Sequence, residues 1–299
     1  MPPIAYPVSA QVTPIVVNGV MYLTAIGRVV ALDPDSGKEI WSYPVNGLSR
    51  RGVAYVPGEA GNAPRLVFTA GRRLIALNAK DGTEAWSAQT VDPQDGAVIT
   101  GAPRVFNGKV VIGFSGGDFS PLRGYVTAYD AATGAQKWRW FTVPGDPSKP
   151  FENEAMARAA KTWDASGKWW ESGGGGTVWD AMAYDPETDL LYFGTGNGTP
   201  WNRKQRSEGF GDNLFLSSIV AVKAKTGEYA WHYQHTPADD WDYDSTNHII
   251  LADLKIDGKD RKVVLQAPKN GVFYVLDRVT GEFISAGPFS RVNWAKVPL

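Results

Sequence analysis

The chain has 299 residues, of which 43% are hydrophobic and only 20% charged, so it can build a sizeable core and disorder is not expected. Thirty basic and thirty-one acidic residues give a net charge of −1, and the basic ones are scattered, which favours a small-molecule ligand over nucleic acid or an anionic membrane. The absence of cysteine excludes disulfides and thiolate chemistry. No apolar run is long enough for a membrane span, and "MPPIAYPVSA" lacks the pattern of a signal peptide.

The first elements are short β-strands. "TPIVVNG", "VMYLTA" and "RVVAL" are runs rich in β-branched residues, separated by Asn-Gly and Gly-Arg turn signals, and "DPDSG" turns the chain into "KEIW". Residues 13–41 are therefore predicted to form a four-stranded antiparallel meander.

A recurring phrase marks the end of each such unit. It reads "ALDPDSGKEIW" (31–41), "ALNAKDGTEAW" (76–86), "AYDAATGAQKW" (128–138), "AVKAKTGEYAW" (221–231) and "VLDRVTGEFI" (275–284), with a degenerate copy at 183–194. The period of about 40 to 55 residues is typical of β-propeller blades. Six units predict an all-β propeller, and we expect residues 1–299 to be one incomplete propeller domain.

The tryptophans of the phrase are interpreted as structural. Trp41, Trp86, Trp138 and Trp231 recur at its end. An indole laid flat between neighbouring blades would need a small side chain beside it, and the alanine at the start of the phrase fits that need.

An insertion interrupts the blades between residues 139 and 182. It contains a short helical pattern, "NEAMARAAKTW", and then Gly173–Gly176, followed by Thr177 and Trp179. The glycines are either a loose linker or a backbone that can lie against something flat. In "GTGNGT" (194–199), Asn197 could offer its side-chain oxygen to a metal.

The segment "DDWDYDSTN" (239–247) places four carboxylates within six positions. In an extended chain Asp242 and Asp244 would project to one side, and Trp241 and Tyr243 to the other. Two such acids need a cation or a proton between them unless the segment is a solvated acidic loop.

Several of these stretches together resemble one family. "ITGAPRV" (99–105), "RGYVTAYDAATG" (123–134), "GGGGTVWDAMAYDPETDLLYFGTGNGTPWN" (173–202), "DDWDYDST" (239–246) and "APKNGVFYVLDR" (267–278) are similar to the pyrroloquinoline quinone (PQQ)-dependent alcohol dehydrogenases. That quinoprotein family has an eight-bladed propeller with tryptophan-docking repeats, so about six of eight blades would be present. The implied activity is oxidation of a primary alcohol or related hydroxyl compound by hydride transfer to PQQ.

The resemblance also implies the site residues. The positions that match the cofactor contacts are Arg51, Thr100, Ser115, Gly116, Gly117, Thr177, Trp179 and Lys269. The positions that match metal ligands, for calcium or a lanthanide, are Asp118, Asn197 and Asp242, with Asp244 as an additional ligand in the lanthanide-using branch. Asp242 would be the general base, and Lys269 would stabilise negative charge on the quinone oxygen.

The expected partners are an alcohol substrate and an electron acceptor such as a cytochrome c or a quinone, in the periplasm. Three departures from the family concern the site: "GLSRRGV" (47–53) lacks the usual adjacent cysteines, Gln11 replaces a glutamate near the cofactor, and Asp118 replaces the glutamate ligand. A PQQ-dependent aldose dehydrogenase and a non-catalytic propeller scaffold are the alternatives.

Overall fold

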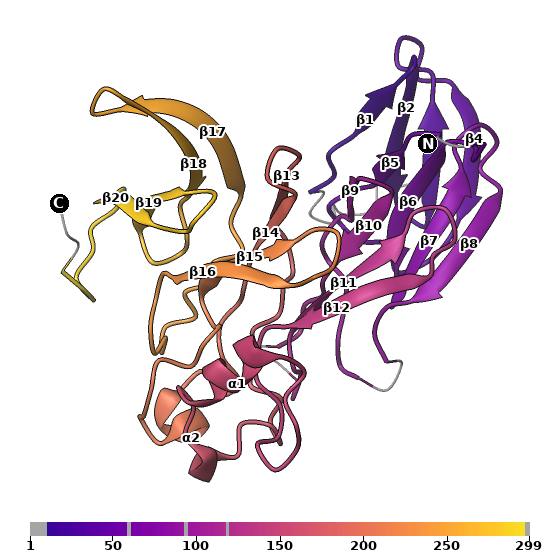
Figure 1. The fold of residues 1–299 in the computed structure, drawn as a ribbon. Coiled ribbons are helices and arrows are strands. Elements are labelled where there is room, and N and C mark those ends of the chain that lie inside the picture. Colours follow the sequence, from indigo (N-terminus) through magenta and orange to yellow (C-terminus); the bar gives the residue numbers. More distant parts are fainter. Residues whose placement is uncertain (1–10, 59–60, 93–94, 118–119, 297–299) are drawn as a thin grey trace. The chain divides into compact units, whose positions relative to one another are not determined.

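The regular structure is almost entirely β-sheet. The computed structural model describes residues 11–296 except 59–60, 93–94 and 118–119. The described residues form five four-stranded sheets, and in each sheet every strand lies beside its neighbour in sequence (Figure 1). This is the meander that the turn signals predict: Ile15 pairs with Tyr22, for example, in an antiparallel register.

The strands of the five sheets, in chain order, are β1 (Ile15–Val17), β2 (Val20–Ala25), β3 (Arg28–Leu32) and β4 (Glu39–Pro44); β5 (Ala54–Val56), β6 (Arg65–Ala70), β7 (Arg73–Asn78) and β8 (Glu84–Gln89); β9 (Arg104–Phe106), β10 (Lys109–Ile112), β11 (Tyr125–Asp130) and β12 (Gln136–Phe141); β13 (Met182–Asp185), β14 (Leu190–Gly194), β15 (Ser218–Lys223) and β16 (Tyr229–Gln234); and β17 (Ile249–Ile256), β18 (Lys259–Gln266), β19 (Val272–Asp277) and β20 (Phe283–Pro288). Three short helices accompany them: α1 (Glu154–Ala160), η1 (Ala165–Gly167) and α2 (Arg203–Ser207).

Six phrases correspond to five sheets because two of the phrases belong to one sheet. The degenerate copy at 183–194 forms β13 and β14, and the next copy, at 221–231, contributes β15 and β16 to that same sheet. The stretch from 195 to 217 separates β14 from β15, so a single blade spans two copies of the phrase.

The chain divides into two compact units. The first comprises residues 1–94, 98–112 and 128–137, and the second 95–97, 113–127 and 138–299. The boundary runs through β11 and β12. The expectation of a single propeller domain stays a prediction.

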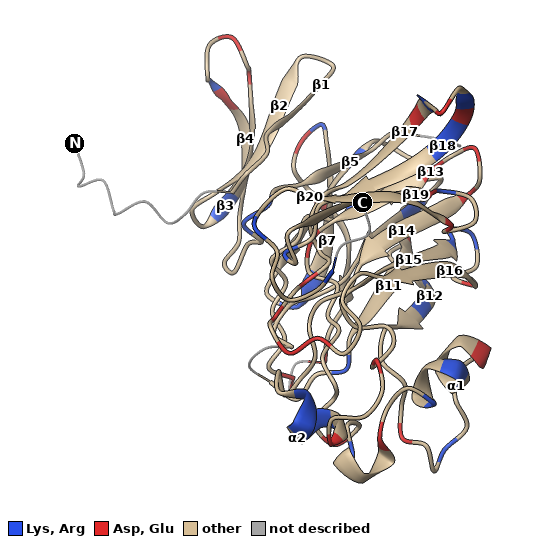
Figure 2. Cartoon of the chain, turned by 90° about the vertical axis from the view of Figure 1, so that its left-hand side faces the viewer, with Lys and Arg blue, Asp and Glu red and all other residues tan. Residues whose placement is uncertain are grey.

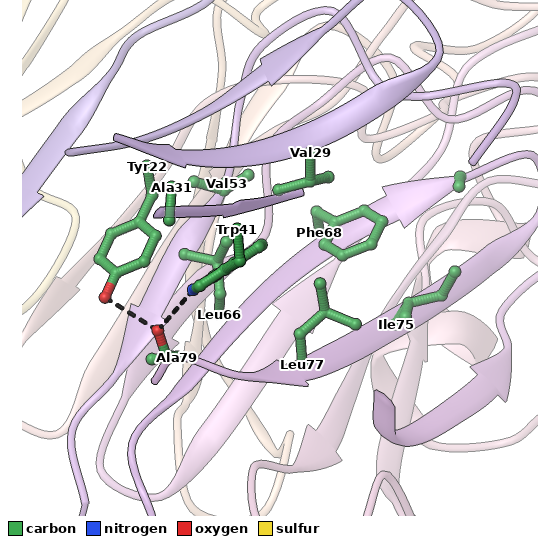
Figure 3. Packing of buried hydrophobic residues seen from close by; sticks show 11 residues of the cluster. Tyr22, Val29, Ala31, Trp41, Val53, Leu66, Phe68, Ile75, Leu77 and Ala79 are labelled. Carbon is green, nitrogen blue, oxygen red and sulfur yellow. Dashed lines mark hydrogen bonds between the residues drawn. The ribbon is translucent and has the colours of Figure 1, made fainter. Parts of the chain in front are cut away.

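In the first unit, Trp41 is the centre of the packing between two sheets. Its indole Nε1 donates to the carbonyl of Ala79 at 3.1 Å, and the hydroxyl of Tyr22 donates to the same carbonyl at 3.2 Å (Figure 3). Leu66, Phe68 and other buried residues fill the space around the ring. One carbonyl of the second sheet thus fixes two aromatic side chains of the first.

The small residue that accommodates each indole is the glycine of the next full copy of the phrase. A Cβ at Gly82, Gly134, Gly227 or Gly281 would lie 2.6–2.8 Å from the ring of Trp41, Trp86, Trp138 or Trp231, respectively. The phrase alanine does something else: Ala31 pairs with Trp41 across β3 and β4. The prediction that the tryptophans are structural is therefore confirmed, but the alanine is not the residue that makes room.

The insertion is a packed element of the second unit. Asn153 caps α1 by accepting from the backbone of Met156 at 3.0 Å, as a short polar side chain does at a helix start. Behind the helix, Trp163 and Trp169 are buried, and their indole N–H groups donate to the carbonyls of Leu214 and Pro144.

Charged side chains gather away from the sheet interiors. Figure 2 shows acidic and basic residues at the tip of the β17–β18 hairpin and on α1, and basic residues on α2, whereas most of the strand ribbon belongs to uncharged residues. None of the helices in the described ranges is long and apolar enough to cross a membrane.

A pair of glycine substitutions tests the packing of tryptophan on glycine. Gly281 and Gly258 have almost the same backbone φ, +77° and +74°, but a Cβ would meet Trp231 at 2.6 Å only at Gly281. Each Gly→Ala change should cost about 1–2 kcal/mol for the left-handed backbone. Gly281→Ala should lose a further ~1–3 kcal/mol from overpacking. Urea unfolding of both variants measures the difference, and equal losses would contradict this account of the packing.

Candidate functional site

The glycine segment Gly173–Gly176 is tightly packed within the second unit. All four residues have φ between +69° and +82°, a conformation that strongly favours glycine. A Cβ at Gly173 would lie 2.4 Å from the backbone of Leu122, and one at Gly175 would lie 2.6 Å from the carbonyl oxygen of Asn197. The backbone of Gly176 donates to that same carbonyl at 2.8 Å. The loose-linker interpretation is therefore wrong.

This segment places Thr177 beside the loop 115–117, which carries three other predicted cofactor contacts. A Cβ at Gly117 would lie 3.0 Å from Thr177 Cγ2, so the side chain of Thr177 lies directly against the backbone of Gly117. Gly116, with φ +111°, and Ser115 precede it on the loop. Thr177 is buried, and Trp179, two positions later, is half-buried. The structure thus brings together the predicted contacts Ser115, Gly116, Gly117 and Thr177.

Asn197 and Asp244 are held together at the end of β14. The backbone N–H of Asn197 donates to Asp244 Oδ1 at 3.0 Å, and both residues are buried. A Cβ at Gly196 would lie 3.0 Å from the same oxygen, so glycine permits the close approach of the carboxylate. The side-chain nitrogen of Asn197 donates to the carbonyl of Gly198, which leaves its amide oxygen as the group able to accept or coordinate.

Asp242 and Asp244 share the ammonium group of Lys269. Lys269 Nζ lies 2.7 Å from Asp242 Oδ2 and 3.3 Å from Asp244 Oδ2. The backbone N–H of Lys269 also donates to the carbonyl of Asp244. The other oxygen of Asp242, Oδ1, is buried and has no hydrogen-bond partner among the described residues. The pair of acids is thus neutralised in part, with one carboxylate oxygen left unengaged.

The electrostatics of Lys269 follow from these contacts. Burial acts to lower its pKa, but the hydrogen bond to Asp242 and the negative charges of Asp244 and Asp242 outweigh burial, so the pKa is raised. Lys269 is therefore a cation at neutral pH.

The alternation predicted for "DDWDYDSTN" holds, although the segment is not a strand. Trp241 and Tyr243 stack on each other with ring centres 5.6 Å apart, and Trp294 packs against both rings. Asp242 between them has φ +61°, in the left-handed region that non-glycine residues seldom occupy. Aromatic groups and acids thus separate as expected, but through a turn.

Residues that the sequence did not indicate support this turn and the chain after it. Gln266 donates to the carbonyls of Ser245 and Asn247 at 2.6 and 2.9 Å. His235 Nδ1 lies 2.9 Å from Ser245 Oγ, and burial lowers the pKa of His235 to about 3, so the imidazole is neutral. No spacing rule connects these residues, because their contacts arise only from the fold.

Two predicted cofactor contacts belong to the first unit. There, Arg51 Nη1 donates to the carbonyl of Thr100 at 3.0 Å, and Ser49 Oγ also donates to that carbonyl at 2.8 Å. Asp118, predicted as a metal ligand, lies outside the described residues.

The donor set suits an oxygen-coordinated cation. Among the described residues no group of three His, Cys, Asp or Glu side chains is placed to hold a metal. Asn197 and the unengaged Asp242 Oδ1 nevertheless supply amide and carboxylate oxygens, the ligands that calcium and lanthanides prefer. A chain with these donors fits a hard cation and does not fit a thiolate or imidazole site.

Comparison with known proteins now identifies the family. Residues 3–297 match the model described as "PQQ: Glucose/ethanol/alcohol dehydrogenase, beta-propeller domain". The chain belongs to this family, which confirms both the predicted resemblance and the β-propeller fold.

Similar proteins include a quinohemoprotein alcohol dehydrogenase of Comamonas testosteroni, 55% identical over 95% of this chain and 41% of the relative. The dehydrogenase subunit of a quinone alcohol dehydrogenase from Gluconobacter oxydans is 47% identical, over 95% of this chain and 40% of the relative. The crystal structure of the Comamonas enzyme superposes with a TM-score of 0.90 and 54% identity, over 97% of this chain and 44% of that one.

A europium-containing methanol dehydrogenase gives a TM-score of 0.81 at 37% identity, over 95% of this chain and 52% of that one. The chain spans less than half the length of the curated relatives it matches.

Replacing Lys269 by Met tests the shared ion pair. The change keeps the aliphatic stem but leaves buried Asp244 without its cation, and should lower the free energy of unfolding at pH 7 by about 1–2 kcal/mol. Because the folded pKa of Lys269 is raised above 10.5, its contribution is fully present below that pH and is lost as the pH rises through the folded pKa.

The matched control is Lys262→Met, which removes an exposed ion pair with Glu187 and should cost less than about 1 kcal/mol. Urea unfolding at pH 7 and above pH 10.5 compares the two variants. A Lys269→Met loss no larger than the control's would contradict the stabilising role of the pair.

Proposed function

We propose that this chain forms the cofactor-binding and catalytic part of a PQQ-dependent dehydrogenase that oxidises a primary alcohol or a related hydroxyl compound. The observation that carries the proposal is that Lys269 binds both Asp242 and Asp244, while Asp244 also accepts from the backbone of Asn197, all within the second unit. A purely structural propeller has no need for a buried carboxylate oxygen without a partner, beside a second acid and a lysine. The names of the relatives, quinohemoprotein and quinone alcohol dehydrogenases, support the same activity.

The cofactor would lie against the loops that the glycine segment holds together. Trp179 would present an aromatic face to the planar quinone, and Thr177 would donate or accept a hydrogen bond. Ser115, Gly116 and Gly117 would allow close backbone approach, and Arg51 and Thr100 remain predicted contacts from the first unit. When bound, PQQ would supply the hydride acceptor.

Asn197 and Asp242 would hold the metal, with Asp118 and Asp244 as the further predicted ligands. A divalent or trivalent cation there would polarise the quinone as a Lewis acid. The ion is calcium or a lanthanide, and the europium-containing relative supports the second choice.

Asp242 would act as the general base, and its two oxygens have different roles. Oδ2 is held by Lys269 at 2.7 Å, which fixes the carboxylate. Oδ1 has no partner among the described residues and carries two lone pairs, so it would both contact the cation and receive the hydroxyl proton of the alcohol. Lys269, being a cation, would also stabilise negative charge that develops on a quinone oxygen within its reach.

The proposed partners follow from the family. The substrate is a small alcohol, and the electrons would pass to a cytochrome c or a quinone, in agreement with the names of the relatives. The periplasm is the proposed compartment.

Asp242→Asn tests the role of the base. An amide keeps the shape of the carboxylate but cannot accept the proton, so turnover in a full-length propeller that carries this segment should fall by about 10²–10⁴-fold. PQQ binding, measured by quenching of tryptophan fluorescence, should change little.

Lys269→Ala is the companion variant and should reduce turnover less than Asp242→Asn, since it removes only one of two electrostatic stabilisers. Equal and modest losses in both variants would contradict these roles. Absence of PQQ binding by the parent would contradict the proposed function as a whole.

Asp244→Ala distinguishes a metal ligand from a neighbouring charge. A trivalent ion gains more than calcium from an additional carboxylate, because the attraction scales with charge. If Asp244 binds the metal, the variant should lose much more of the lanthanum-dependent than of the calcium-dependent activity of the PQQ-loaded propeller. Equal activity of parent and variant with either ion would exclude Asp244 from the metal shell.

A further inference from the structure

Asp239 makes an unusual set of contacts three residues before the proposed base. Its side chain is buried, with 2% of the residue exposed. Oδ1 accepts from the backbone N–H of Trp241 at 3.1 Å and from that of Tyr243 at 3.3 Å, and Oδ2 lies 3.3 Å from the same Tyr243 nitrogen. One carboxylate therefore binds the backbone on both sides of Asp242.

These two hydrogen bonds account for the backbone of Asp242. Residue 242 lies between the two bound N–H groups and has φ +61°. The left-handed conformation costs a non-glycine residue about 1–2 kcal/mol and persists only where the surroundings enforce it. Here a buried carboxylate supplies that constraint, because its Oδ1 accepts from the backbone N–H groups on both sides of Asp242.

Arg206 in α2 ties this turn to the loop that carries Asn197. The guanidinium is completely buried, and Nη2 donates to the carbonyl of Asp239 at 2.9 Å. Nη1 donates to the carbonyl of Trp201 at 2.8 Å, and a Cβ at Gly198 would lie 2.5 Å from Cζ. The turn of Asp242 and the loop after Asn197 are thus fixed to one rigid group.

We propose that Asp239 is a positioning residue that holds Asp242 in its left-handed conformation and so directs its carboxylate toward Lys269 and the reacting hydroxyl group. This inference rests on the proposed function for its catalytic consequence, but its conformational part stands without it. The hydrogen bonds that the Asp239 side chain makes among the described residues go to backbone groups of the turn, so it acts through Asp242.

Two substitutions separate the acceptor oxygen from the rest of the side chain. Asp239→Asn retains an oxygen at the position of Oδ1, which accepts both N–H groups, and should preserve the turn. Asp239→Leu keeps a similar size but accepts nothing. Asp240→Asn is the matched control, because it removes a neighbouring carboxylate that instead accepts from the backbone of Arg203. If Asp239→Leu fails to fold, Asp239→Ser, too short to reach both N–H groups, takes its place.

The first measurement is hydrogen exchange by mass spectrometry on peptides covering 239–244, in this chain without cofactor. The Trp241 and Tyr243 amides should exchange at least about tenfold faster in Asp239→Leu than in the parent, and at parental rates in Asp239→Asn and Asp240→Asn. Unchanged exchange in Asp239→Leu would overturn the proposal, whether or not the parent is an active enzyme.

The second measurement is the steady-state kinetics of the full-length propeller loaded with PQQ and calcium. Misplacement of the base should lower kcat of Asp239→Leu by about 10²-fold and change KM less than about threefold, with recovery in Asp239→Asn. A kcat no lower than that of Asp240→Asn, or a loss that follows weaker PQQ binding, would overturn the positioning role. A parent that binds no PQQ would instead count against the proposed function.

Discussion

Two aspartates that share one lysine are the interaction on which the candidate site depends. Asp244 is almost fully buried, and a carboxylate taken out of water must be compensated by a cation or by hydrogen bonds. Lys269 and the backbone N–H of Asn197 provide both. Because Lys269 also binds Asp242, the position of half-buried Asp242 depends on buried Asp244. The three side chains thus form one ion-pair cluster.

The sheets bring distant loops into contact around these three side chains. Sheets that repeat the same meander place β14 and the loop after it beside the segment that follows β16, and glycines at positions such as Gly175 and Gly196 let backbone and carboxylate approach. Tryptophans stacked on turn glycines hold neighbouring sheets within each unit. These tryptophans therefore stabilise the sheets, and the polar groups of the candidate site lie where the loops meet.

The strands could be predicted from sequence because their signals are local. Asn-Gly turns, β-branched runs and the recurring phrase each act within a few residues, and the meander follows from them. The common sheet of β13–β16 was harder to foresee, because a 23-residue excursion between β14 and β15 hides their pairing. The glycine that contacts each indole was likewise not predicted, since that contact joins residues about 40 to 90 positions apart.

The residues of the candidate site likewise fall into those that a local sequence pattern predicts and those that only the fold reveals. Alternation of side chains predicted that Asp242 and Asp244 face one way, although a turn and not a strand achieves it. Lys269 was expected only through the family resemblance. Asp239 was one of the four clustered acids, but nothing indicated its role, and no residue pattern indicated Arg206. Their importance lies in hydrogen bonds to backbone groups, which carry no side-chain signature in the sequence. Supporting residues of this kind become visible only when the fold is known.

We propose that the loops around Asp242, Asn197 and Trp179 form one site for a quinone and a hard cation. The most direct measurement is a crystal structure of the protein with PQQ and lanthanum, using anomalous scattering to locate the ion. The account predicts the ion against the side-chain oxygens of Asn197 and Asp242, with the quinone on the face of Trp179. An ion bound elsewhere, or a quinone without contact to Trp179 and Thr177, would contradict it.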